Sequence, residues 1–212
     1  MKLYSFFRSG TSHRLRIALN LKGLTPDYIP IDLRIDEQSE DAYKAINPQG
    51  LVPALALENG QTLIQSTAII EWLEETHPEP ALLPAESEAR AYVRALASIT
   101  GCDVHPINNR RILQYLRNNF CSDDSAIDAW CGHWISAGFD AIEALLEKDS
   151  HRKGFCFGIT PTLADVYLIP QIESARRFNV DMQRWPLISE IDRTCSTLPA
   201  FANAAPLAQP DA

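Results

Sequence analysis

The chain has 212 residues, of which 46% are hydrophobic and 22% are charged, the usage of a folded globular protein and not of a disordered one. Lys and Arg total 19 against 27 Asp and Glu, and the resulting net charge of -8 argues against a nucleic acid partner. No apolar run is long enough to span a membrane and no signal peptide is recognisable, so we expect no membrane association.

The cysteines are five in number and widely spaced, which is typical of free thiols in a reducing compartment, the cytoplasm. Only Cys131 and His133 lie close together, and residues two apart on a helix point to different faces. We therefore expect a packing role for this pair and no metal site.

The first part of the chain alternates between strand and helix patterns. In chain order, the pattern predicts a strand over 2–7, a helix over 12–22, a strand over 27–33, a short helix over 39–46, strands over 52–57 and 61–64, and a helix over 66–76. Asn59-Gly60 favours a hairpin between two of the strands, and Pro30 restricts its strand to a sheet edge or a bulge. The order βαβαββα predicts an α/β domain over residues 1–80.

The rest of the chain has helical periodicity throughout, after a proline-containing linker. The expected helices cover 86–118, with a kink at Pro106, and 125–148, 162–177 and 186–197, and the tail after Pro206 is expected to be loose. Thr162 and Asp165 have the spacing of an N-capping box, which we assign to fold stability. Residues 86–212 are therefore predicted to form an all-α domain.

Hydroxyl side chains gather in the turn between the first strand and the first helix. In the run from Arg8 to Ser12, they lie beside exposed N–H groups and the positive end of the helix dipole, where a thiolate has a lowered pKa. This arrangement fits an activated sulfur nucleophile. The alternative is that Ser9 or Ser12 only caps the helix.

Two further places suit a short anionic peptide. A cis peptide bond at Val52-Pro53 would expose the main chain of Val52 for pairing with a bound peptide. Gln65 and Ser66 offer an amide, a hydroxyl and helix N–H groups to an α-carboxylate, although a plain N-cap explains Ser66 equally well. Together with the hydroxyl turn, they predict a grip along one edge of the domain.

Several motifs resemble the zeta class of glutathione transferases. They are the runs 6–19 (FFRSGTSHRLRIAL), 47–53 (NPQGLVP) and 65–75 (QSTAIIEWLEE), with further matches at 162–167 and 177–181, so the resemblance covers nearly the whole chain. The class usually has Ser-Ser-Cys where this chain has Ser9-Gly10-Thr11. Ser9 and Thr11 therefore both remain candidates for the hydroxyl beside the sulfur.

The resemblance implies a glutathione transferase fold, with a thioredoxin-like N-terminal domain and a helical C-terminal domain, and glutathione as the cofactor. It also implies a homodimer and a glutathione-dependent cis–trans isomerase of aromatic-compound catabolism, which converts maleylpyruvate to fumarylpyruvate or, as the alternative, acts on maleylacetoacetate. The implied glutathione-binding residues are Ser9, Thr11, Gln49, Val52, Pro53, Gln65, Ser66, His105 and Asn109.

Arginines indicate the substrate class despite the negative net charge. Arg8 lies in the hydroxyl turn, and the pairs Arg110-Arg111 and Arg176-Arg177 lie on expected helices. Such groups suit a small substrate with two carboxylates, because a guanidinium binds a carboxylate as a planar fork. Neighbouring helix residues diverge by about 100°, so one of each pair at most faces a site, and the other covers a solvated helix face.

We select Arg8, Arg110 and one of Arg176 and Arg177, of which the class motif favours Arg177 while the helix register admits Arg176. The catalytic candidates are Ser9, Thr11, Arg8 and His105, the last as a proton handler. Three rival functions remain. A general conjugating or dehalogenating transferase needs no pair of carboxylate clamps, a thiol-disulfide oxidoreductase would need a cysteine in the turn, and a binding module would have no activity.

Overall fold

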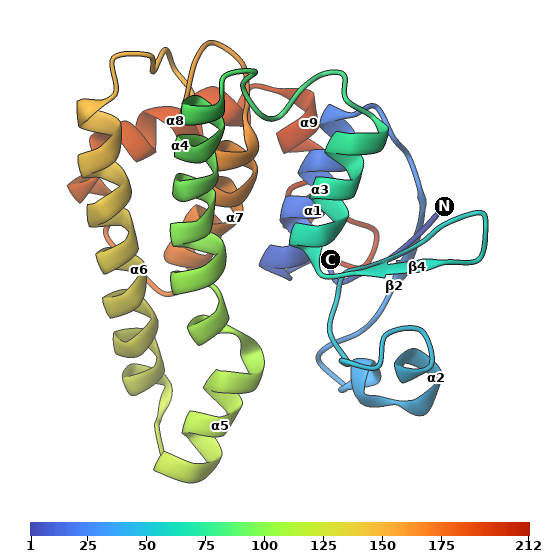
Figure 1. Cartoon of the computed structure of the whole chain (residues 1–212). Coiled ribbons are helices and arrows are strands. Elements are labelled where there is room, and N and C mark those ends of the chain that lie inside the picture. Colours follow the sequence, from blue (N-terminus) through green and yellow to red (C-terminus); the bar gives the residue numbers. More distant parts are fainter. The chain divides into compact units, whose positions relative to one another are not determined.

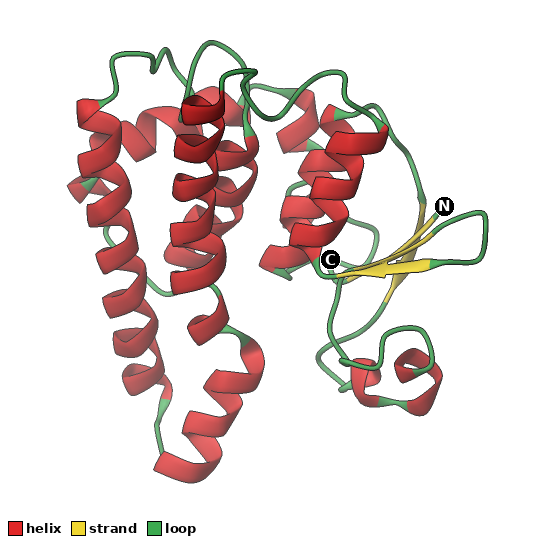
Figure 2. Cartoon of the chain, in the orientation of Figure 1, coloured by secondary structure: helices red, strands yellow, loops and turns green.

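The computed structural model describes residues 1–212, which divide into two units. The first unit contains residues 1–81 and 197–212, and the second contains residues 82–196. Figure 2 shows strands in the first unit and helices in both. The matching sequence prediction, an α/β part followed by an all-α part, is confirmed at the level of the elements.

A four-stranded sheet in the order β2-β1-β3-β4 organises the first unit. β1 pairs in parallel with β2 and antiparallel with β3, and β3 pairs antiparallel with β4, so β1 and β4 run in the same direction. Pro30 ends β2 at the sheet edge, as its missing N–H predicts. The strands are β1 (Lys2–Ser5), β2 (Asp27–Pro30), β3 (Ala54–Ala56) and β4 (Thr62–Ile64).

Two helices of the first unit, α1 and α3, pack against each other and run side by side in Figure 1. α1 follows the carboxyl end of β1 and α3 follows that of β4, so both helices begin at the same edge of the sheet. In α/β folds this edge is where ligands bind. The helices of this unit are α1 (Gly10–Leu21), α2 (Asp41–Lys44), α3 (Ser66–Thr76) and α9 (Pro199–Ala202), with short 3-10 turns at Glu37–Ser39 and Pro206–Ala208.

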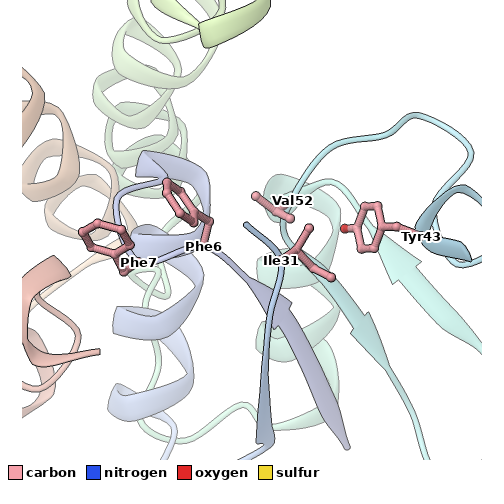
Figure 3. Packing of buried hydrophobic residues seen from close by; sticks show 5 residues of the cluster. All are labelled: Phe6, Phe7, Ile31, Tyr43 and Val52. Atoms are coloured by element: carbon pink, nitrogen blue, oxygen red, sulfur yellow. The ribbon is translucent and has the colours of Figure 1, made fainter. Parts of the chain in front are cut away.

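A hydrophobic cluster lies where β1 ends and the hydroxyl turn begins (Figure 3). It contains Phe6, Phe7, Ile31, Tyr43 and Val52, all buried, and the Phe6 and Phe7 rings meet edge to face with centroids 4.8 Å apart. Such a cluster fixes the main chain on both sides of the turn, because closely packed aromatic rings leave little room for movement.

The second unit is helical. α7 is buried along most of its length and packs against α4, α6 and α8. Asp165 accepts hydrogen bonds from the N–H of Thr162 at 2.7 Å and from its hydroxyl at 2.8 Å, which confirms the predicted capping box. The helices are α4 (Ser87–Ser98), α5 (Arg110–Phe120), α6 (Asp124–Lys148), α7 (Leu163–Arg177) and α8 (Pro186–Ser196), with a π-helix at Ile99–Val104 and 3-10 turns at Pro106–Asn108 and Met182–Arg184.

The predicted continuous helix over 86–118 is wrong. The chain leaves α4 through the π-helix, turns at Pro106, and starts again at α5 with Asn109 as its N-cap. Pro106 has no N–H to continue the helical ladder, and the Asn109 side chain caps a new helix by accepting from the N–H of Arg111 at 3.2 Å.

The end of the chain also differs from the prediction. Residues 197–212 group with the first unit, whereas the sequence assigned them to the helical domain, and the segment after Pro206 is docked and not loose. Phe201 is buried, and Asp211 accepts hydrogen bonds from the N–H of Phe7 and the hydroxyl of Tyr28. No helix of the chain is both long and apolar enough to cross a bilayer.

Candidate functional site

The N-terminus of α1 is capped by Ser9. The N–H of Ser12 donates to Oγ of Ser9 at 3.3 Å, so the capping role considered for Ser9 is confirmed. The first turn carries no acidic residue, and its positive end is not compensated by a carboxylate of its own. The exposed Arg8 adds a full positive charge immediately before the cap, with its guanidinium 5.8 Å from the Phe7 ring centroid. Both charges favour an anion here.

A chain of hydrogen bonds joins the hydroxyls of Ser9 and Thr11 to the main chain of Val52. The two hydroxyl oxygens lie 2.9 Å apart, and the Thr11 hydroxyl donates to the carbonyl of Val52 at 2.9 Å. Thr11 has one proton and commits it to Val52, so Ser9 is the donor in the Ser9–Thr11 bond. Ser9 is therefore the hydroxyl that can turn its proton toward a third group.

The loop before Val52 is fixed by Asn47. Its amide donates to the carbonyl of Leu51 at 2.7 Å, its carbonyl oxygen accepts from the N–H of Gln49 at 3.1 Å, and the Tyr43 hydroxyl also donates to Leu51 at 2.7 Å. These bonds explain the presence of an asparagine at position 47 of the Asn-Pro motif. The peptide bond between Val52 and Pro53 is cis, as predicted.

Gln65 holds an unusual backbone conformation at the start of α3, with φ +67°. A residue with a side chain adopts this region only where its surroundings enforce it, and such positions concentrate at binding sites. Its side-chain amide donates to Oε1 of Gln49 at 2.6 Å, so two predicted glutathione-binding residues are in contact.

Ser66 is not the N-cap that the sequence allowed. Gln65 occupies that position, and Ser66 is the buried first residue of α3. The first turn of α3 has neither a side-chain cap nor an acidic residue, so its N–H groups suit a carboxylate. The first unit therefore has two helix N-termini at one sheet edge that suit anionic groups.

Buried ionisable groups lie directly behind the hydroxyl turn. His13 is buried, and desolvation, with a smaller contribution from the Arg16 charge, lowers its pKa to about 3. His13 is therefore neutral at physiological pH. Burial lowers the pKa of Arg16 to about 10, and Arg16 remains charged.

Arg16 and Asp211 both bond to the main chain of Phe7, just before the hydroxyl turn, and the sequence did not single them out. Arg16 donates to the carbonyls of Phe7 at 2.9 Å and Ala204 at 3.0 Å. An arginine on the apolar face of a predicted helix was the available signal for Arg16, because such a charge needs buried partners. Asp211, in a segment with a loop-like composition, carried no such signal.

In the helical unit, His105 and Asn109 do not lie on one long helix, as had been expected. His105 follows the π-helix and Asn109 caps α5. Arg110, the first residue of α5, is half-buried, whereas Arg111 is exposed. The two arginines thus differ in environment, as helix geometry requires of neighbours.

Arg176 and Arg177, at the end of α7, differ in their partners. Arg176 donates to Glu173 at 2.7 Å and also pairs with Asp192, so two carboxylates compensate its charge. Arg177 donates to the hydroxyl of Ser174 at 3.2 Å, and its guanidinium lies 4.7 Å from the Phe178 ring centroid. A substrate carboxylate would compete with two anions at Arg176.

Comparisons with known proteins identify the family of this chain. Residues 8–76 match the glutathione S-transferase N-terminal domain family. A maleylpyruvate isomerase from a Ralstonia species is 64% identical over 211 residues, which cover 100% of this chain and 99% of the relative. A maleylacetoacetate isomerase from Pseudomonas aeruginosa is 46% identical over 213 residues, covering 100% and 98%. The chain belongs to the glutathione S-transferase family.

Solved structures define the class more narrowly. A holo maleylpyruvate isomerase, described as a bacterial glutathione S-transferase of the zeta class, has a TM-score of 0.98 at 64% identity and 100% coverage of both chains. A maleylacetoacetate isomerase from Methylobacterium extorquens with bound malonate and glutathione has a TM-score of 0.96 at 36% identity, covering 100% of this chain and 99% of that one. The class of this chain is therefore zeta.

Proposed function

We propose that this chain is a glutathione-dependent cis–trans isomerase that converts maleylpyruvate to fumarylpyruvate. The full-length identity of 64% to a maleylpyruvate isomerase supports the choice of substrate. The structural observation that carries the proposal is the hydrogen-bonded chain from Ser9 through Thr11 to Val52 at the N-terminus of α1.

The first unit fits glutathione, a small peptide with a thiol and two carboxylates. The bare N-terminus of α3, with Ser66 and the amide of Gln65, matches the γ-glutamyl end, and Gln49 supports Gln65. The main chain of Val52, before cis-Pro53, matches the central cysteinyl part. We further assign His105 and Asn109 of the helical unit to glutathione binding.

Ser9 is assigned to the thiol. Its hydroxyl proton turns from Thr11 to the sulfur, which breaks the Ser9–Thr11 hydrogen bond, while Thr11 stays bonded to Val52. A hydrogen bond to the ionised form, together with the α1 dipole and the charge of Arg8, lowers the thiol pKa. Thr11 is then assigned to the main chain of Val52 and Ser9 to the thiol, which separates the roles of the two candidate hydroxyls.

Bound glutathione would supply a thiolate nucleophile for reversible addition to the double bond conjugated with the ketone. The addition would place an electron pair on the ketone oxygen and leave a carbon–carbon single bond free to rotate, and loss of the thiolate would restore the double bond as trans. The protein keeps the thiol ionised, orients the two carboxylates of the substrate, and stabilises negative charge on the ketone oxygen. His105 or an arginine fills the last role.

Arg8, Arg110 and one of Arg176 and Arg177 are assigned to the substrate carboxylates. Related structures hold similar acids: one contains malonate with glutathione, and another contains dicarboxyethyl glutathione with citrate. Planar guanidinium groups bind such acids as forks. The partners of Arg176 and Arg177 differ enough for single variants to decide between them.

We also propose a cytoplasmic homodimer. The five free cysteines, three of them buried, support a reducing compartment. Sedimentation of the purified chain tests the dimer, and a single species at the mass of one chain contradicts it.

Maleylacetoacetate is the second candidate substrate, favoured by the 46% identity to a maleylacetoacetate isomerase. The two substrates differ in the group beyond the ketone. Initial rates with each, followed by proton NMR in the presence of glutathione, decide between them.

We expect a higher kcat/KM for maleylpyruvate. A higher value for maleylacetoacetate would favour the second candidate. Conjugation of chlorodinitrobenzene without isomerisation would point to a general transferase, and retention on immobilised glutathione without either activity would point to a binding module.

A further inference from the structure

The segment that ends the first unit contacts the turn carrying Arg8 and Ser9. One carboxylate oxygen of Asp211 accepts from the N–H of Phe7 at 3.0 Å, and the other accepts from the hydroxyl of Tyr28 at 2.7 Å. Asp211 lies 204 positions from Phe7 in the chain, so this contact exists only because residues 197–212 dock on the first unit.

Arg16 also holds Phe7, through the carbonyl group of that residue. Its guanidinium donates to the carbonyl of Phe7 at 2.9 Å and, through Nε, to the carbonyl of Ala204 at 3.0 Å. Both polar groups of Phe7 are thus bonded to charged side chains, the N–H to Asp211 and the carbonyl to Arg16. Hydrogen bonds to charged groups are the stronger class.

Holding Phe7 also orients the two residues that follow it. Arg8 follows Phe7 directly, and the N–H of Ser9 closes the turn on the carbonyl of Phe6 at 3.1 Å. The Phe6 and Phe7 rings are packed in the cluster of Figure 3, which leaves the main chain little freedom. The hydrogen bonds of Phe7 restrict the freedom that remains. A shift of about 1 Å in a positioned group costs on the order of a hundredfold in rate.

We propose that Asp211 is a positioning residue for the thiol site, acting through the main chain of Phe7 on the directions of Ser9 and Arg8. This inference rests on the proposed function for its catalytic consequence. The segment 204–211 is then part of the site's support, and Arg16 is the buried group that joins it to the turn.

Three variants isolate the Phe7 bond. Asp211→Ala removes both hydrogen bonds of the carboxylate. Asp211→Asn keeps one acceptor for Phe7 and turns its amide to the Tyr28 oxygen, which can accept. Tyr28→Phe is the matched control, since it removes the Tyr28 bond and leaves the Phe7 bond intact.

Each variant is measured in three ways. Hydrogen exchange of the amides of residues 7–11, without glutathione, reports the order of the turn. The pH dependence of the thiolate ultraviolet absorbance of bound glutathione reports its thiol pKa, and kcat/KM for maleylpyruvate reports catalysis.

For Asp211→Ala we expect faster exchange in the turn, a raised thiol pKa and kcat/KM lower by about tenfold. The kcat/KM of Asp211→Asn should stay within about threefold of the parent value and that of Tyr28→Phe within about twofold, because in both variants residue 211 still accepts from the N–H of Phe7.

A purely structural role for Asp211 would lower the melting temperature of Asp211→Ala and leave the thiol pKa and the exchange of residues 7–11 at the parent values. That result overturns the proposal, as does a Tyr28→Phe variant as impaired as Asp211→Ala. If the parent does not isomerise maleylpyruvate but exchange and thiol pKa respond as expected, the positioning role stands and the proposed function fails.

Discussion

α1 holds the charge of Arg16 inside the fold, whereas the paired arginines of the helical unit lie nearer the surface. Arg16 is buried and bonded to main-chain carbonyls, but Arg111, Arg176 and Arg177 are exposed, and Arg176 pairs with carboxylates of the surface. Fixed geometry suits a cofactor that is the same in every turnover. Exposed side chains can be substituted to suit a different substrate at little cost in stability.

The largest expected contrast concerns stability. Arg16→Met leaves the carbonyls of Phe7 and Ala204 without their donor, and we expect it to lower the free energy of unfolding by about 3–5 kcal/mol. Arg111→Met, on an exposed surface, should change it by less than about 0.5 kcal/mol. Urea unfolding of both variants measures the difference, and equal losses would remove the distinction between the two regions.

The arginine clamp gives the next effect. We expect Arg8→Met or Arg110→Met to lower kcat/KM for the diacid by about ten- to 150-fold, the equivalent of about 1.5–3 kcal/mol for a hydrogen bond to a charged group. Lysine at these positions should rescue only in part, because it keeps the charge and loses the fork. Glutathione retention should change far less than the rate.

A monocarboxylate analogue is the control for the clamp. The parent should strongly prefer the diacid, and a clamp variant should lose most of that preference. Equal loss on both substrates would instead indicate a damaged glutathione site. Arg176→Met and Arg177→Met, compared in the same assay, identify which residue of the pair binds substrate.

Burial of His13 in the first unit predicts that the stability of the fold depends on pH. Its pKa is lowered to about 3 in the folded protein, against an ordinary value of 6.5, so the unfolded chain binds a proton first as pH falls. The folded state therefore loses stability below pH 6.5, and we expect a loss of about 2 kcal/mol between pH 7 and pH 5 from this residue.

Urea unfolding at the two pH values checks this expectation. His13→Gln should lack the His13 contribution and show a smaller pH dependence than the parent. If stability depends on pH in His13→Gln as it does in the parent, the pKa of His13 does not differ between the folded and unfolded states.

The smallest contrast lies between the two hydroxyls. Ser9→Ala should raise the thiol pKa of bound glutathione and lower turnover at neutral pH by about fivefold, with partial recovery at higher pH, because a hydrogen bond to the thiolate is lost. Thr11→Ser keeps the donor to Val52 and should behave like the parent. If Thr11→Ala raises the pKa and Ser9→Ala does not, the assigned roles are reversed.

The sequence was sufficient for elements set by local rules. The Asn59-Gly60 hairpin, the edge position of Pro30 and the capping box at Thr162 are all confirmed. Each depends on residues close together in the chain, whose conformational preferences act before any tertiary contact forms.

Long-range docking was beyond the sequence. The Phe7–Asp211 bond and the return of residues 197–212 to the first unit join parts far apart in the chain, and this short segment, rich in alanine and proline, has no periodicity that would predict them. The break before Asn109 was missed because one proline permits either a kinked helix or two helices. The roles of the predicted site residues stay predictions for the variants above.

In the proposed reaction, glutathione acts as a cofactor and is regenerated in every turnover. The direct measurement uses purified protein, maleylpyruvate in large excess and glutathione at about one hundredth of the substrate concentration, with all species followed by proton NMR. We expect complete conversion to fumarylpyruvate with the glutathione signal unchanged at the end. Conversion that stops after one equivalent of glutathione, with a stable conjugate accumulating, would contradict it.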